Sequence, residues 1–262
     1  MANLKLLFRV TIPGQADTAP AYLSGVITPQ GKMDLVFLTT TDGHTVAVNG
    51  ANGDVIWQHQ YGPNGCNINR SEKIWACYTT ASPAVDPNRQ YVYSYGVDGL
   101  VHKYQVGDGK EITGSGWPQL STTKSVHEKG SSSLAFATNR SGVSYLYVAS
   151  SGYPGDQGDY QGHLTTINLA TGEQRVFNTL CSDQTVHFLE TPSKPDCEET
   201  QGAIWGRPGV IYSQNPLAGP PDRRDPLGKP DRRQRHPLHP RPGKPPQRLR
   251  LTLERNRQLG IG

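Results

Sequence analysis

The most polar segment of the chain, residues 152–163, places acidic side chains and a histidine on a glycine-rich stretch. Asp156 and Asp159 offer the oxygen ligands that Ca²⁺ prefers, and His163 adds a nitrogen suited to a transition metal. These three residues are the candidate metal ligands. Their spacing differs from the alternating Asp pattern of a Ca²⁺ loop, so a hairpin insertion whose aspartates cap backbone amides remains the alternative interpretation.

A second polar cluster combines His127, Glu128 and Lys129 with the serine run 131–133. A base beside a hydroxyl is the arrangement that activates a nucleophile. The cluster lacks the Gly-x-Ser-x-Gly turn that presents such a serine in hydrolases, so we interpret it as a solvated loop. No catalytic residue is predicted.

The four cysteines form two pairs that are local in sequence, Cys66 with Cys77 and Cys181 with Cys197. Disulfides within these pairs would close loops of 11 and 16 residues, each stabilising the fold by about 2–4 kcal/mol. Free buried thiols and a metal site are the alternatives, although no Cys-x-x-Cys spacing is present. Disulfides would indicate a periplasmic or extracellular protein, and the first ten residues lack the apolar core of a signal peptide.

The elements that would position these residues follow a repeat of glycines. Short runs of β-branched and aromatic residues flank each glycine. Because glycine adopts the positive φ of tight hairpin turns, each unit predicts strand, turn, strand, turn, strand. The paired turn glycines, always ten residues apart, are Gly43 and Gly53, Gly99 and Gly109, and Gly162 and Gly172.

A further short apolar piece precedes each unit, at 19–23, 82–85 and 133–137, which makes four strands per unit. The pieces start 63 and about 50 residues apart, a spacing typical of the four-stranded blades of a β-propeller, with a β-sandwich as the alternative. Residues 203–212 predict the first strands of a fourth unit. Residues 4–10 predict a strand ahead of the first.

Residues 42–57, Asp-Gly-His-Thr-Val-Ala-Val-Asn-Gly-Ala-Asn-Gly-Asp-Val-Ile-Trp, resemble the repeat of the PQQ-like β-propellers, the quinoprotein alcohol dehydrogenase-like superfamily. Trp57 stands at the blade-closing position of that repeat. The match is weaker in the second unit, where Trp117 falls later, and partial in the third, where Phe177 takes the aromatic place. The resemblance spans residues 19–212 and implies an all-β propeller of four-stranded blades: about three blades and the start of a fourth, a fragment of a longer protein.

The resemblance implies PQQ and calcium as the cofactors of those family members that are dehydrogenases. Their cofactor slot commonly has a tryptophan floor and a disulfide between adjacent cysteines, and this chain has no Cys-Cys dipeptide. We therefore expect a non-catalytic binding or scaffold module with a protein or carbohydrate partner. The alternative is a part of a PQQ-dependent alcohol or sugar dehydrogenase.

Three histidines lie close to the same turn of successive units. His44 and His163 follow the turn glycine by one residue, whereas His102 follows it by three. Only two of the three are equivalent, so a ring of metal-binding histidines is a hypothesis that the spacing supports only in part.

The charge of the chain divides it near residue 215. Residues 1–215 contain 14 Lys+Arg and 18 Asp+Glu, whereas residues 216–262 contain 12 and 4, together with 10 prolines and no Trp, Tyr, Phe, Val or Cys. We predict a partial propeller over 1–215 and a disordered Pro/Arg-rich tail over 216–262, which a shifted reading frame would also produce. Without interleaved aromatic residues the tail is not expected to bind nucleic acid, and no apolar run is long enough to span a membrane.

Overall fold

The computed structural model describes residues 5–62, 77–153, 159–180 and 201–210. These ranges contain strands, turns and bends but no helix, and hence no helix that could span a membrane. Contacts between Cα atoms divide the chain into Met1–Ser213 and Gln214–Gly262. The second unit lies outside the described residues, so the predicted disorder of the tail stays a prediction.

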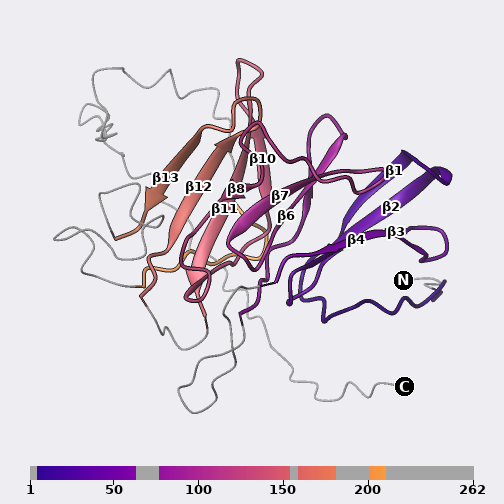
Figure 1. Cartoon of the computed structure of the whole chain (residues 1–262), viewed down its shortest axis with the longest axis horizontal. Coiled ribbons are helices and arrows are strands. Elements are labelled where there is room, and N and C mark those ends of the chain that lie inside the picture. Colours follow the sequence, from indigo (N-terminus) through magenta and orange to yellow (C-terminus); the bar gives the residue numbers. More distant parts are fainter. Residues whose placement is uncertain (1–4, 63–76, 154–158, 181–200, 211–262) are drawn as a thin grey trace, which may run out of the picture. The chain divides into compact units, whose positions relative to one another are not determined.

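The described strands form antiparallel sheets whose neighbours follow chain order, as Figure 1 shows. Four consecutive strands in one sheet are the form of a propeller blade, which confirms the predicted fold class. The first blade contains β1 (Ala21–Thr28), β2 (Gly31–Thr39), β3 (His44–Asn49) and β4 (Val55–Gln60); the second contains β5 (Ala84–Val85), β6 (Tyr91–Tyr95), β7 (Leu100–Gln105) and β8 (Gln119–Leu120); the third contains β10 (Ala135–Thr138), β11 (Ser144–Gly152), β12 (His163–Asn168) and β13 (Gln174–Asn178), and β9 (Glu128–Gly130) pairs with β11.

The turns between strands depend on the predicted glycines at five of six positions. Gly43, Gly53, Gly99, Gly109 and Gly172 have φ between +70° and +89°, a region that other residues rarely adopt. Gly162 departs from the prediction, since it is not among the residues with positive φ. Its backbone instead approaches Gly202 so closely that no side chain would fit, and its N–H donates to the Gln201 carbonyl.

The register of the blades shows which residues are equivalent. Trp57 pairs with Ala47 on β3. In the third blade the residue at the place of Ala47 is Thr166, and its partner is Arg175. Phe177 therefore takes the place of His59, not that of Trp57, and the prediction that it closes the third blade is wrong. A β-bulge at Ala47/Val48 shifts the register of the first blade, which counting residues from the glycine does not reveal.

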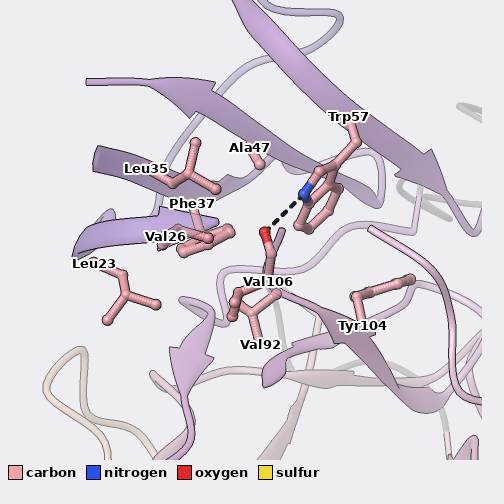
Figure 2. Close-up of a cluster of buried hydrophobic side chains, with 9 residues drawn as sticks. All are labelled: Leu23, Val26, Leu35, Phe37, Ala47, Trp57, Val92, Tyr104 and Val106. Carbon is pink, nitrogen blue, oxygen red and sulfur yellow. Dashed lines mark hydrogen bonds between the residues drawn. The ribbon is translucent and has the colours of Figure 1, made fainter. Parts of the chain in front are cut away.

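The contact between the first two blades is an apolar cluster around Trp57. The indole N–H of Trp57 donates to the Val106 carbonyl at 3.1 Å, as Figure 2 shows, and its ring covers Gly109. A Cβ at Gly109 would lie 2.5 Å from that ring, so the turn glycine also allows the two blades to approach. The buried members are Leu23, Val26, Leu35, Phe37, Ala47, Trp57, Val92, Tyr104 and Val106.

A second apolar cluster joins the second and third blades. Tyr93 packs against Trp117 and Phe136, with ring centroids 5.0 Å and 5.4 Å apart. Trp117 is 6% exposed, so this late tryptophan does pack at a blade contact. The cluster consists of Ala81, Tyr93, Tyr95, Val101, Trp117, Leu134, Leu146, Val148 and Ile167.

Short segments ahead of each blade carry hydroxyl side chains that bond to the backbone of the next segment or blade. From the end of β2, the Thr39 hydroxyl donates to the Ala81 carbonyl of such a segment at 2.7 Å. From the segments themselves, Thr80 donates to the Ser131 carbonyl at 3.1 Å and Ser131 donates to the Ile204 carbonyl at 2.8 Å. Each bond satisfies a backbone group that no strand ladder reaches. These segments are called the inner segments below: residues 15–19, 77–83, 130–134 and 204–207.

Two predicted strands are replaced by irregular chain. Residues 5–10 form no strand; Phe8 and Val10 instead cover Gly53, much as Trp57 covers Gly109. The described part of the predicted fourth unit, 203–210, also contains no strand, and just ahead of it a single bridge joins Gln201 to Gln161.

Candidate functional site

One set of buried charged groups lies where the second and third blades meet. Glu128 is fully buried; the Thr122 hydroxyl donates to its carboxylate at 2.5 Å and the Gln161 backbone N–H at 3.0 Å. Lys124 donates to Asp159 at 3.1 Å and to the Gln161 side chain at 2.8 Å. Burial raises the pKa of Glu128, although His163 and these hydrogen bonds oppose the rise.

His163 belongs to the same network. Its Nδ1 lies 2.8 Å from the Gln161 carbonyl, and its Nε2 lies 3.0 Å from the Ser121 carbonyl. The Ser150 hydroxyl also lies 2.8 Å from Nδ1. The Glu128 carboxylate stands 3.9 Å away as the nearest anion.

A second set of charges lies between the first and second blades. His102 Nδ1 is 2.7 Å from Glu111, and its Nε2 is 3.1 Å from Asp98. The ring stacks on Tyr61 with 3.8 Å between centroids, and the Tyr61 hydroxyl donates to Glu111. Burial alone would lower the pKa of His102, but Asp98 and Glu111 outweigh it and raise the pKa above its usual value.

A third set is formed by the inner segments. The Lys129 ammonium lies 4.0 Å from the ring centre of Tyr78 and 5.3 Å from that of Trp205. Burial lowers the pKa of Lys129 to about 8, against the opposing charge of Asp17. Asp17 itself pairs with Arg207 at 3.0 Å, on the exposed side of the same segments.

The predicted metal ligands are only partly described. Asp156 lies outside the described residues, so the three-residue site stays a prediction. Asp159 is bonded to Lys124, and His163 is held by two backbone carbonyls. Hydrogen bonds from Gln161 and Lys124 outweigh burial and lower the pKa of Asp159. Among the described residues, no three His, Cys, Asp or Glu side chains are grouped to hold a metal ion.

The three histidines of the repeat have separate partners. His44 bonds to Asp42 at 3.0 Å, His102 to its two carboxylates, and His163 to backbone carbonyls. Each histidine thus stabilises its own turn or blade contact.

The interpretation of residues 127–133 as a solvated loop is wrong for most of the segment. Glu128 and Lys129 lie on β9, and both are buried, as are Ser131 and Ser132. The Ser131 hydroxyl donates to the Ile204 carbonyl. These residues join blades through hydrogen bonds.

Of the predicted disulfide cysteines, only Cys77 is among the described residues. It is 6% exposed and packs with Val97 and Tyr153. Cys66, Cys181 and Cys197 lie outside them, so both pairings stay predictions.

The fold is that of β-propeller blades. Similar solved structures include a quinohemoprotein alcohol dehydrogenase from Pseudomonas putida HK5, at 16% identity over 68% of this chain and 22% of that one, with a TM-score of 0.44. The quinohemoprotein alcohol dehydrogenase from Comamonas testosteroni is 17% identical over 64% of this chain and 21% of that one, with the same TM-score. BamB from Moraxella catarrhalis is 19% identical over 55% and 37%, with a TM-score of 0.33.

The chain spans between 21% and 37% of the length of these three structures. No protein-family model and no curated protein sequence matches it. These structures therefore show only which known folds the blades resemble.

Sequence reasoning overlooked the partners of these buried charges. Glu128 and Gln161 are 33 residues apart, and Tyr61 and Glu111 are 50 apart, so no local spacing links them. The available signal was the repeat itself: Lys103 and His102 are polar on a strand whose counterpart in the first blade, Val46-Ala47, is apolar.

Proposed function

We propose that the chain is a non-catalytic binding or scaffold module made of PQQ-like propeller blades, part of a longer protein exported to the periplasm or cell exterior. One observation carries this proposal: most of the buried acids and bases at the blade contacts are held by hydrogen bonds to other residues of the chain. His102 is held by two carboxylates, Lys124 by Asp159 and Gln161, and Glu128 by Thr122 and Gln161. Groups engaged in this way stabilise the blade contacts.

The alternative function, a part of a PQQ-dependent alcohol or sugar dehydrogenase, needs residues to hold the quinone and its calcium ion. The described residues do not fit that requirement, since no three acidic or histidine side chains are grouped and no two cysteines are adjacent in the sequence. The polar segment 154–158 lies outside the described residues. We therefore derive no chemical step through PQQ.

Titration of the full chain with PQQ and Ca²⁺ tests this choice. We expect no quinone absorbance to remain with the protein after gel filtration, and no reduction of a redox dye on addition of alcohols or sugars. Stoichiometric retention of quinone together with dye reduction would overturn the non-catalytic assignment and favour the dehydrogenase.

The exported location has its own test, because it rests on the cysteines. Protein produced in an oxidising compartment should show no free thiol when unfolded, and peptide mapping should find Cys66 joined to Cys77 and Cys181 joined to Cys197. Four reactive thiols under the same conditions would contradict the export proposal and leave the binding role unaffected.

A further inference from the structure

Lys103 occupies a strand position that the other two blades fill with small uncharged residues. It pairs with Tyr93 across β6 and β7; the equivalent pairs are Phe37 with Ala47 and Tyr147 with Thr166. In the first blade this face packs against the next blade and buries Ala47 completely. The second blade therefore carries a cation where packing alone calls for a small apolar side chain.

The Lys103 ammonium is surrounded by aromatic rings. It lies 4.1 Å from the ring centre of Tyr91, 5.3 Å from that of Trp117 and 5.8 Å from that of Tyr93. Ring faces attract a cation but accept no strong hydrogen bond. Within the described part of the chain the ammonium has no hydrogen bond and no ion pair, so all three of its N–H groups remain for a ligand or for water.

This ammonium borders a cavity of about 290 Å³ between the second and third blades. Asp86, Asn88 and Gln90 line one side of the cavity, and Val143, Leu169 and Ala170 line the other. One wall thus offers hydrogen-bonding groups and the opposite wall offers aliphatic carbon. A cavity with few polar groups facing apolar ones is the usual form of a small-molecule site.

The carboxylate of Asp86 limits which anionic ligands can bind beside Lys103. Its Oδ1 accepts hydrogen bonds from the backbone N–H groups of Gln90 and Tyr91, at 2.8 Å and 2.9 Å. Its Oδ2 has no such bond within the described residues. A simple anion beside Lys103 would meet this carboxylate without compensation, whereas a ligand that also carries hydroxyl groups can donate one to Oδ2.

We propose that the cavity binds a sugar acid of the uronate class, with its carboxylate on Lys103, hydroxyl groups on Asp86 and the side-chain amides of Asn88 and Gln90, and the C–H face of its ring against Val143 and Leu169. The proposal rests on the binding role proposed above and names its ligand. Burial lowers the pKa of Lys103, and the charge of Asp86 opposes the shift.

Isothermal titration of the full chain with D-glucuronate tests the proposal. Glucuronate should bind. D-glucose, which lacks the carboxylate, and acetate, which lacks the hydroxyls, should each bind at least about tenfold more weakly than glucuronate. Lys103→Thr, which installs the residue of the third blade, should weaken glucuronate binding about tenfold or more. Lys110→Ala removes the same charge from an exposed position of the second blade and should leave binding unchanged.

Asp86→Asn distinguishes a sugar acid from a bare anion. Asparagine keeps an acceptor for the two backbone N–H groups but loses the negative Oδ2, so it should weaken glucuronate binding. Tighter binding by this variant, equal binding of acetate, or unchanged affinity in Lys103→Thr would each overturn the proposal.

A measurement on the wild-type chain tests the site without depending on whether the variants fold. Mass spectrometry should show that glucuronate protects Lys103 from acetylation several-fold, with Lys110 unprotected in the same sample. Equal labelling of Lys103 with and without glucuronate would contradict the site. Because no quinone or dye is involved, this failure is separate from failure of the non-catalytic assignment.

Discussion

Ala47 and Lys103 stand at the same place in the first and second blades, and the two blade contacts differ around them. At the first contact Ala47 is fully buried beneath Trp57 and Phe37. At the second, Lys103 lies among Tyr91, Tyr93 and Trp117, and a cavity remains beside it. The same blade position is therefore fully buried in the first blade and borders a cavity in the second.

The most severe test of this difference is to place the lysine in the first blade. Ala47→Lys would bury a long cation in a full cluster, and the combined cost of desolvation and overpacking should destabilise the chain by about 5 kcal/mol or more. Urea unfolding followed by tryptophan fluorescence measures this loss. A folded variant of wild-type stability would show that the first contact also has room for a cation.

Removing the tryptophan of the first contact should have the next largest effect. Trp57→Ala deletes the ring over Gly109 and the hydrogen bond to Val106, so it should destabilise the chain by about 3–5 kcal/mol. Trp57→Phe retains most of the packing and should recover more than half of the loss in the same unfolding experiment. Equal losses for both variants would mean that the ring is not what holds the contact.

The dependence of stability on pH should reveal the contribution of His102, which lies at the contact between the first and second blades. Because Asp98 and Glu111 raise its pKa in the folded chain, its contribution to stability is complete below its ordinary pKa of about 6.5. That contribution is lost as pH rises through the higher folded-state pKa. Urea midpoints measured from pH 6 to 9 should fall in the wild type, and His102→Gln should remove this part of the fall. A wild-type slope equal to that of the variant would contradict the assignment.

The smallest effect on stability is expected at the second contact itself. Lys103→Ala loses cation–π attraction to three rings but also relieves a partly desolvated charge, so the free energy of unfolding should change by no more than about 1 kcal/mol. Urea unfolding beside Ala47→Lys makes the comparison direct. A loss as large as that of Trp57→Ala would show that Lys103 is structural.

The glycine spacing was enough to predict the blades, because a positive φ at Gly43, Gly53, Gly99 and Gly109 is a local requirement that the residue type reveals. It failed at Gly162, where the glycine serves a close approach to Gly202, a residue 40 positions away in the chain. The spacing of residues along the sequence does not show which residues contact each other across blades.

The candidate sites were harder to predict for the same reason. Glu128 has polar neighbours in sequence, which is typical of a solvated loop, yet two of its partners, Gln161 and His163, come from the third blade. Phe177 follows Gly172 by five residues whereas Trp57 follows Gly53 by four, and the β-bulge of the first blade moves the equivalent of Trp57 to Arg175. Lys103 is different, because the alignment of equivalent positions in the three blades is enough to mark it as the charged one.

The ion pair between Asp17 and Arg207 joins residues 190 positions apart, yet both side chains are largely exposed. Such a pair contributes about 1 kcal/mol or less, too little to offset the entropy of closing so long a loop. The hydroxyls of Ser131 and Ser133, which bond to Ile204 and Arg207, already hold that segment in place. The ion pair is therefore a consequence of where the last inner segment lies and does little to hold it there.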